Sequence, residues 1–273
     1  MKIDILGVKV DAIRKDELEE SLTRIFALRK KSYIFTPNTE FVMHAQKDDE
    51  FKQVLNSSSI NLPDGIGLLW AAKFNSLKVP ATPVLGQIIT IMLWIITIFS
   101  IIFYPKFLKK PIPERIPGSD FVWPLAKFAA DNKLKIFLLG GASTIAERAA
   151  LKLQTDIYGL KIAGVSALDP KDRDRILSLI NKSRADILLV AYGAPKQEIW
   201  LKNNLSETCC KLGVGVGGTF DFLAGTRKRA PQFIRAIGLE WLYRLILEPK
   251  RIKRQLTIPR LGLTMLMNKL SNK

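Results

Sequence analysis

Short apolar runs alternate with helix-like segments along most of the chain. The apolar runs are IDILGVKV at 3–10, YIFTPN at 33–38, KIFLLGG at 135–141, KIAGVSA at 161–167, ADILLVAYGA at 185–194 and CKLGVGVGG at 210–218. Helical patterns lie between them, at 16–30, 39–55, 143–154, 172–183 and 196–204. Because such alternation builds parallel strands covered by helices on both faces, we predict an α/β fold with a Rossmann-like, mostly parallel sheet. A chain of 273 residues can bury a core of this size.

Polar or glycine-rich segments follow several of the predicted strands. Ligands of open parallel sheets bind beyond the carboxyl ends of the strands, so these segments are candidate sites. They are Thr36 to Asn38, Gly140 to Thr144, Gly193 to Glu198 and Gly217 to Asp221. Gly140 and Gly141 precede a helix with Ser143 and Thr144 in its first turn, which can direct backbone N–H groups to a phosphate. A tight turn without a ligand explains the glycine pair equally well.

The run GVGVGG at 213–218 has some of the spacing of a dinucleotide-binding turn. That turn leads directly into a helix, whereas TFDFLAG follows here and predicts no clear helix. We therefore do not expect a nicotinamide enzyme, and we predict no cofactor.

Metal binding is not predicted either. His44 is the only histidine and lies in a helical pattern, where packing explains it, so a histidine-based metal cluster is excluded. Asp48 and Asp49 fall in the middle of the same predicted helix and are typical of a solvated face. No carboxylate group suited to a divalent cation is evident.

Asp64 lies in NLPDGIGLLWAAK, at the expected start of a helix. A carboxylate at that position can serve only as the N-cap of the helix. It can also act as a general base on a rigid turn and take a proton from an acceptor hydroxyl. The residue alone does not separate these interpretations.

The run VLGQIITIMLWIITIFSIIFY, residues 84–104, contains no charged residue. As a helix it is about 30 Å long, which matches the hydrocarbon core of a bilayer. Three interpretations are open: a helix that lies in or dips into the membrane, a buried core helix or dimer interface, and a true crossing. Gln87, Thr90, Trp94, Thr97 and Tyr104 form a weak polar stripe, and Lys106, Lys109 and Lys110 follow.

Positive charge is concentrated at the end of the chain. The net charge is +17, and from Arg227 onward twelve Lys or Arg face only Glu240 and Glu248. Ile234, Ile237, Trp241, Leu245 and Ile246 have helical spacing among these charges. A basic amphipathic helix of this kind suits an anionic membrane surface. Nucleic acid is the rival partner, but no nucleic-acid module is evident, so we expect none.

The cysteines and the first residues indicate the compartment. Cys209 and Cys210 are adjacent, which is a poor geometry for a disulfide, so we expect them to be reduced. The first ten residues lack the long apolar stretch of a signal peptide. We therefore expect the protein to stay on the cytoplasmic side.

Seven blocks of the sequence resemble the WecG/TagA/CpsF family of bacterial glycosyltransferases. They are TPNTEFV, LPDGIGLLWAAK, ERIPGSD, IFLLGG, GAPKQEIWL, GVGGTFDFLAGTRKRAP and GLEWLYRLILEPKRIKR, in the order of the family. The blocks span nearly the whole chain except for about residues 78–112, where the family has a much shorter connection. A single block such as GAPKQE is weak support, whereas seven collinear blocks are specific.

The resemblance implies an inverting, metal-independent transfer of an N-acetylhexosamine-type sugar, N-acetylmannosamine or its uronic acid. The implied donor is a UDP-sugar and the implied acceptor is a sugar on undecaprenyl diphosphate, in cell-surface polysaccharide or teichoic acid synthesis. Two alternatives are a glucosyl or glucuronosyl transferase of exopolysaccharide assembly and a non-catalytic protein that binds lipid or nucleic acid.

The resemblance also assigns roles to residues. Asp64 is the candidate base, and Thr36 and Asn38 line the same pocket. Arg115 faces the diphosphate, and Gln197 and Asp221 contact the nucleotide-sugar. The arginines of the C-terminal appendage touch the membrane and help complete the site: Arg244, Arg251 and Arg254.

These roles constrain the uncharged run. A single crossing would place Thr36 and Asp64 on one side of the membrane and Arg115, Gln197 and Asp221 on the other. We therefore predict a peripheral or monotopic protein on the cytoplasmic face of the membrane, with both ends of the run in the cytoplasm. The predicted organisation is an α/β domain at 1–226, a hydrophobic helical insert at about 78–112 and a basic helical appendage at 227–273. A homo-oligomer is possible.

Overall fold

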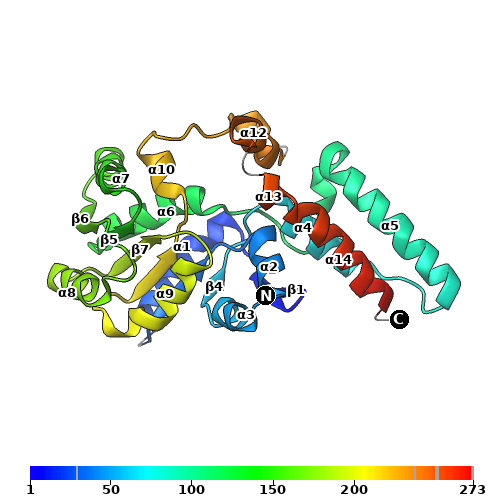
Figure 1. The fold of residues 1–273 in the computed structure, drawn as a ribbon, viewed down its shortest axis with the longest axis horizontal. Helices are drawn as coiled ribbons and strands as arrows, with labels where there is room; N and C mark the ends of the chain where they lie inside the picture. Colours follow the sequence, from blue (N-terminus) through cyan, green and yellow to red (C-terminus); the bar gives the residue numbers. More distant parts are fainter. Residues whose placement is uncertain (29, 237, 250–251, 272–273) are drawn as a thin grey trace.

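A computed structural model describes residues 1–28, 30–236, 238–249 and 252–271. Its centre is a six-stranded sheet in the order β4-β3-β8-β7-β5-β6, in which every neighbouring pair is parallel (Figure 1). The strands are β3 (Ser32–Phe35), β4 (Ile60–Asn61), β5 (Lys135–Gly140), β6 (Lys161–Ser166), β7 (Ile187–Ala191) and β8 (Leu212–Gly215). This arrangement confirms the predicted α/β fold with a parallel sheet flanked by helices.

Helices cover both faces of the sheet. One face packs against α1 (Leu18–Ala27), α6 (Gly118–Asp131) and α7 (Ser143–Asp156). The other packs against α3 (Asp49–Asn56), α8 (Arg173–Ser183) and α9 (Lys196–Asn204). Alternate residues of a strand enter opposite cores: Leu138 of β5 lies in the first core and Leu139 in the second. Since both faces are buried, the central strands β5, β7 and β8 are almost entirely apolar.

Two predicted elements are divided in the structure. The run at 3–10 forms a separate antiparallel hairpin of β1 (Lys2–Ile5) and β2 (Val8–Asp11), because Leu6 and Gly7 both have positive φ and form a two-residue turn. The helix expected at 39–55 divides into α2 (Thr39–Ala45) and α3, and Asp48 is the N-cap of α3, with its side chain accepting from the Phe51 amide at 2.9 Å. The prediction that Asp48 lies in the middle of a helix is therefore wrong.

The uncharged run forms one continuous helix, α5 (Pro83–Phe103). Among the described residues it is the one helix that is long and apolar enough to cross a membrane. It packs against α4 (Ile66–Ser76) and α14 (Thr257–Ser271) at the end of the molecule opposite α7 and α8 (Figure 1). We call α4, α5, α14 and the short helix η2 (Pro105–Leu108) the helical arm.

The C-terminal segment consists of several short helices rather than one long basic helix. They are α11 (Gln232–Ala236), α12 (Glu240–Leu247), α13 (Ile252–Gln255) and then α14. Ile237, which was part of the expected apolar stripe, lies outside the described residues. The remaining elements are η1 (Lys15–Glu17), η3 (Leu205–Glu207) and α10 (Thr219–Leu223).

Candidate active site

The order of the strands reverses between β5 and β7. The chain runs from β5 to β6 in one direction along the sheet and from β7 to β8 in the other, although β5 and β7 are neighbours. Parallel sheets bind ligands at such a reversal, outside the carboxyl ends of the strands. Gly140 ends β5 there with φ 95, and a Cβ atom on it would lie 3.0 Å from the carbonyl carbon of Ala191 in β7. Only glycine fits this turn.

The segment after β8 lies at the same edge of the sheet. Gly217 and Gly218 lead directly into α10, so the prediction that no helix follows the glycine run is wrong. Phe220 of α10 lies against Gly141, where an added Cβ atom would be 3.6 Å from the ring. Asp221 is half-buried, and its carboxylate is 4.0 Å from the Arg227 guanidinium. Gly140, Gly141 and Asp221 thus lie along one edge of the sheet.

Gln197 is buried between the loops that follow β7 and β8. Its Oε1 accepts from the amides of Gly193 and Gly217, at 3.2 and 2.9 Å. Its Nε2 donates to Oε1 of Glu198 at 2.6 Å. Burial raises the pKa of Glu198 to about 7. Because both ends of the Gln197 amide are engaged and the residue is 2% exposed, its role in this conformation is to hold the two loops together.

Thr36 connects this edge to the start of α6. A Cβ atom on Gly118, the first residue of α6, would lie 3.3 Å from Oγ1 of Thr36 and 3.6 Å from Oγ1 of Thr219 in α10. The ends of β3 and β8 and the N-terminus of α6 therefore meet at one point, with Thr36 buried between them.

A pocket of about 200 Å³ lies between the strand ends and the C-terminal helices. The sheet side supplies Asn38 from the start of α2, Asp64 from the turn before α4 and Arg115 from the segment before α6. The C-terminal side supplies Arg244 from α12 and Arg254 from α13. The pocket thus brings together five of the predicted site residues from distant parts of the chain.

Asp64 lies on a rigid turn at this pocket. Its amide donates to the Pro37 carbonyl at 2.9 Å, and the next residue, Gly65, has φ 101 and is the N-cap of α4. Asp64 is therefore not the N-cap, and within the described residues its carboxylate has no hydrogen-bond or ion-pair partner. Burial raises its pKa to about 6, with Glu240 and Asp120 adding to the effect and Arg244 and Arg115 opposing it. Such a carboxyl is largely ionised at pH 7 and can accept a proton.

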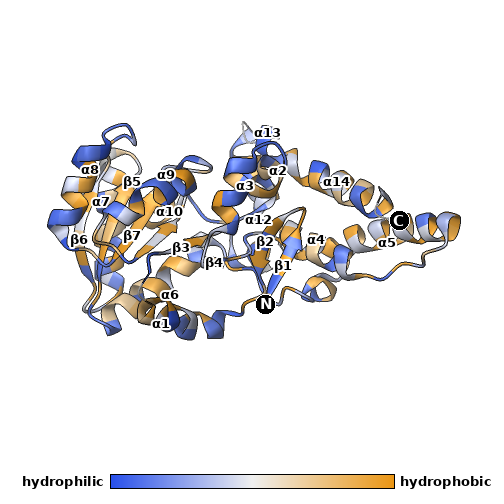
Figure 2. Ribbon diagram, turned by 90° about the horizontal axis from the view of Figure 1, so that it is seen from below, coloured by the Kyte–Doolittle hydropathy of each residue, from blue (hydrophilic) through white to orange (hydrophobic). Residues whose placement is uncertain are grey.

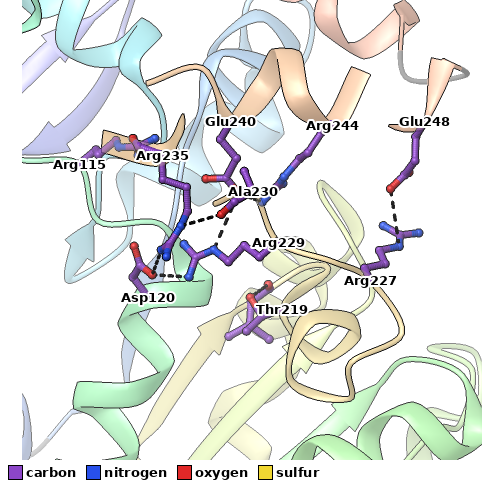
Figure 3. A network of polar contacts seen from close by, with 11 residues as sticks. Arg115, Asp120, Thr219, Arg227, Arg229, Ala230, Arg235, Glu240, Arg244 and Glu248 are labelled. Carbon is purple, nitrogen blue, oxygen red and sulfur yellow. Dashed lines mark hydrogen bonds and ion pairs between the residues drawn. The ribbon is translucent and has the colours of Figure 1, made fainter. Parts of the chain in front are cut away.

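The charged groups beside Asp64 form a connected network (Figure 3). Arg115 donates from its guanidinium to the carbonyl of Arg235. Arg229 donates to Asp120, and the Arg235 guanidinium lies 3.7 Å from the same carboxylate. Burial opposes ionisation of Asp120, but Arg229 and its other cationic neighbours outweigh it and lower its pKa. The network ties the segment after α10 to the first turn of α6.

A cation–π contact and an ion pair hold the C-terminal helices at the pocket. Arg244 donates to Glu240 one turn earlier in α12 and lies over the Phe222 ring, 4.8 Å from its centroid. Arg254 donates from Nε and Nη2 to Oε2 of Glu40 in α2, at 2.9 and 2.6 Å. Arg251, the third predicted arginine of the appendage, lies outside the described residues.

The predicted residues thus occupy two adjoining places. Asn38, Asp64, Arg115, Arg244 and Arg254 line the pocket, whereas the others lie along the strand ends: Thr36, Gly140, Gly141, Gln197 and Asp221.

Sequence reasoning did not single out Asp120, Arg229 or Glu240, although all three lie within the seven blocks. The signal that could have found Glu240 and Arg244 as a pair is their spacing of four residues.

No group of three metal-ligating side chains occurs in the described part of the chain. His44 packs against the Phe51 ring and lies 3.3 Å from the Asp48 carboxylate, in agreement with a structural role.

Known proteins similar to this chain agree with the geometry. The sequence profile of the glycosyl transferase WecG/TagA/CpsF family matches residues 3–93 and 95–273, including most of the segment at 78–112. Relatives in Staphylococcus aureus strains MRSA252 and NCTC 8325 / PS 47 are named N-acetylglucosaminyldiphosphoundecaprenol N-acetyl-beta-D-mannosaminyltransferase. Each is 28% identical over 260 residues, which is 94% of this chain and 89% of the relative. The resemblance of the seven blocks is thereby confirmed, and the chain belongs to the WecG/TagA/CpsF family and is a glycosyltransferase.

Proposed function

We propose that this glycosyltransferase moves N-acetylmannosamine from a UDP donor to an N-acetylglucosamine carried on undecaprenyl diphosphate. The observation that carries the proposal is the shared pocket, which Asp64 lines with Arg115 and Arg244 and in which its carboxylate has no hydrogen-bond or ion-pair partner among the described residues. The names of the relatives support the choice of sugar and acceptor. The product would enter the synthesis of a cell-surface polysaccharide or a teichoic acid.

Asp64 is the base of the proposed reaction. It takes the proton from the acceptor hydroxyl as the hydroxyl oxygen bonds to the anomeric carbon of the donor sugar. The bond from that carbon to the β-phosphate oxygen breaks on the opposite side, and UDP leaves with the electron pair. This single displacement inverts the anomeric configuration, and no enzyme nucleophile takes part.

The donor binds at the carboxyl ends of β5, β7 and β8 in this proposal. The glycine turns at Gly140 and Gly217 allow close approach of the backbone, and the N-terminus of α6 adds partial positive charge. Gln197 holds the loops after β7 and β8 in position for the nucleotide.

The acceptor diphosphate lies nearer to the C-terminal helices. Arg115 and Arg244 line the pocket with Asp64, and a guanidinium can bind two phosphate oxygens at once. These arginines supply positive charge near the reacting groups without a metal ion. Transfer rates are expected to be the same with EDTA and with Mg²⁺, and loss of transfer in EDTA would contradict this part of the proposal.

The test uses purified protein, UDP-N-acetylmannosamine and a short-chain, water-soluble prenyl-diphosphate-N-acetylglucosamine, with product mass and UDP release as readouts. Asp64→Asn is expected to lower kcat by about 10²- to 10⁴-fold, because a positioned base contributes that much. UDP affinity, measured by calorimetry, stays the same. Asp131→Asn, the same change on an exposed residue at the end of α6, is the matched control.

A donor panel tests the sugar. UDP-N-acetylmannosamine is compared with UDP-N-acetylglucosamine, UDP-glucose and UDP-glucuronic acid. Faster transfer from UDP-glucose or UDP-glucuronic acid would point to an exopolysaccharide transferase. UDP binding without transfer from any donor would favour a non-catalytic binding protein, and full activity of Asp64→Asn would remove Asp64 as the base.

A further inference from the structure

The polarity of the two faces of α5 is the reverse of that in a surface helix of a water-soluble protein. Its buried residues are Gly86, Thr90, Thr97 and Ser100, which share one face because they are spaced by four, seven and three residues. That face packs against α4 and α14. A surface helix in water turns its apolar side inward and its polar side outward. In α5 the small and hydroxyl side chains point inward instead.

The inward face of α5 is held by specific hydrogen bonds. Thr97 accepts from the indole N–H of Trp70 in α4 at 3.0 Å and donates to the carbonyl of Trp94 at 3.0 Å. The indole N–H of Trp94 donates to the Gly262 carbonyl in α14 at 2.8 Å. These bonds fix the rotation of α5, so its outward face is a defined surface of the protein.

The outward face of α5 is apolar except for Gln87 near its start, and orange residues recur along the helix (Figure 2). Ile88, Ile91, Ile95, Ile96, Phe99 and Ile102 are each 43–61% exposed. Leu263 and Met267 on the neighbouring α14 are 56% and 62% exposed. A continuous apolar surface of this extent marks a contact with a partner or a membrane.

The segments that carry this apolar surface contain cations and no acidic residue. Residues 65–113 contain five Lys and no acidic residue, and residues 249–273 contain seven Lys or Arg and no acidic residue. These twelve cations account for most of the net charge of +17. Lys106, Lys109 and Lys110 are exposed directly after α5. The arm therefore combines an apolar face with a net positive charge, which is complementary to a leaflet of anionic lipid.

We propose that the outward faces of α5 and α14 lie in the interface of an anionic bilayer, with α5 parallel to the membrane plane. This proposal rests on the proposed function, because a lipid-borne acceptor is the reason for the enzyme to bind a membrane. Ile101 of α5 and Ile258 of α14 line the same pocket as Asp64 and Arg115. The pocket therefore opens at the level of the lipid headgroups, where the acceptor diphosphate is found.

The contacts of α5 favour this orientation over a crossing. The ammonium group of Lys269 in α14 donates to the carbonyls of Phe74 and Leu77, at 2.6 and 2.7 Å, beside the end of α4. Since α5 is packed against α4 and α14, a crossing by α5 would also carry polar groups of these two helices toward the hydrocarbon, at a cost. The charge also favours lipid over a second copy of the chain, because two arms would bring like charges together.

The first test is sedimentation of the full chain with vesicles. We expect binding to phosphatidylglycerol/phosphatidylcholine vesicles and much weaker binding to phosphatidylcholine alone. Ile88→Gln/Ile95→Gln/Phe99→Gln should lower the partition coefficient at least tenfold, and changing the three lysines 106, 109 and 110 to Gln should reduce its salt dependence. Leu151→Gln/Leu179→Gln, on exposed leucines of α7 and α8, is the matched control and should bind like the original chain. Equal binding of the α5 triple variant would overturn the proposal.

Depth measurements separate a flat helix from a crossing. Single cysteines at 88, 95 and 102, seven residues apart on the outward face, carry a fluorophore in a Cys209→Ser background. Quenching by lipids brominated at different depths should place all three probes at the same shallow level. A steady change of depth from 88 to 102 would indicate a crossing and contradict the parallel orientation.

Two controls separate this proposal from its rivals. A chain that sediments as a dimer without lipid, and whose triple variant is a monomer, would show that α5 is a self-association face. Transfer to the short-chain, water-soluble acceptor is expected to be unchanged in the triple variant, while transfer to vesicle-borne acceptor falls with binding. If the original chain transfers to neither acceptor, the proposed function fails, and vesicle binding still decides the membrane proposal.

Discussion

The two ends of this molecule use the same apolar residues in opposite ways. In the sheet, Leu138 and Leu139 of β5 are completely buried, each in one of the two cores. In the helical arm, Ile95 and Phe99 of α5 face outward, while Thr97 and Ser100 are buried. Hydrophobic burial drives both arrangements if the arm meets lipid, because the apolar face then leaves water as the strands do. The comparison shows that buried hydroxyl groups, as well as exposed isoleucines, identify which face of a helix packs against protein.

The largest expected difference comes from matched truncations in the two regions. Leu138→Ala should lower the free energy of unfolding by about 2–5 kcal/mol, because it leaves a cavity in a closed core. Ile95→Ala should change it by less than about 0.5 kcal/mol, because the side chain is outside the packed interior. Urea unfolding followed by circular dichroism measures both. A loss of more than about 1.5 kcal/mol for Ile95→Ala would show that α5 is covered by protein, and the contrast would disappear.

A smaller effect is expected from removing a hydroxyl inside the arm. Thr97→Val keeps the shape of the side chain but leaves the indole N–H of Trp70 without its acceptor. We expect the free energy of unfolding to fall by about 1–3 kcal/mol, the cost of a buried unpaired donor. Thr155→Val, at an exposed position in α7, is the control. If Thr97→Val stabilised the protein, the inward face of α5 would behave like an ordinary apolar core.

The smallest effect concerns the pocket between the two regions. Because burial raises the pKa of Asp64 to about 6, transfer to the soluble acceptor should fall as the pH drops through 6, about tenfold per pH unit below it. Arg244 lowers this pKa, so Arg244→Gln should move the fall to higher pH whatever its effect on the maximal rate. The dependence of kcat/KM on pH measures both. A fall near pH 4 in the original chain would mean that Asp64 is not the titrating base.

The sheet could be predicted from sequence because its determinants are local. The strands β5 and β7 are unbroken apolar runs and the helices α8 and α9 have clear periodicity, so pattern alone locates them. The hairpin β1–β2 was not predicted, because the sequence shows one alternating run and the break depends on the positive φ of Leu6 and Gly7. The division between α2 and α3 depends on the Asp48 side chain capping the second helix. A periodicity pattern does not reveal such a bond.

The candidate site was accessible to sequence reasoning only in part. Asp64 and Arg115 lie in blocks that resemble a family, so they could be named without a structure. The ion pair Glu40–Arg254 and the contact of Arg244 with the Phe222 ring depend on where α12 and α13 pack, and no sequence pattern specified that. The orientation of α5, with its hydroxyl side chains inward, could not be predicted for the same reason, because it depends on how α5 packs against α4 and α14. A helical wheel identifies the stripe with Thr90 and Thr97, but it does not say which side faces the protein.

The residues that line the pocket are spread along the chain, so the pocket cannot form until the last of them has been synthesised. Its walls run from Asn38 to Ile258. At translation speeds of 5–20 residues per second, roughly 10–40 s separate the synthesis of these two walls. A nascent chain can therefore complete its sheet while the pocket still lacks one wall. In the proposed mechanism, sugar transfer needs the pocket wall that α12 to α14 supply, and this wall is made after the sheet.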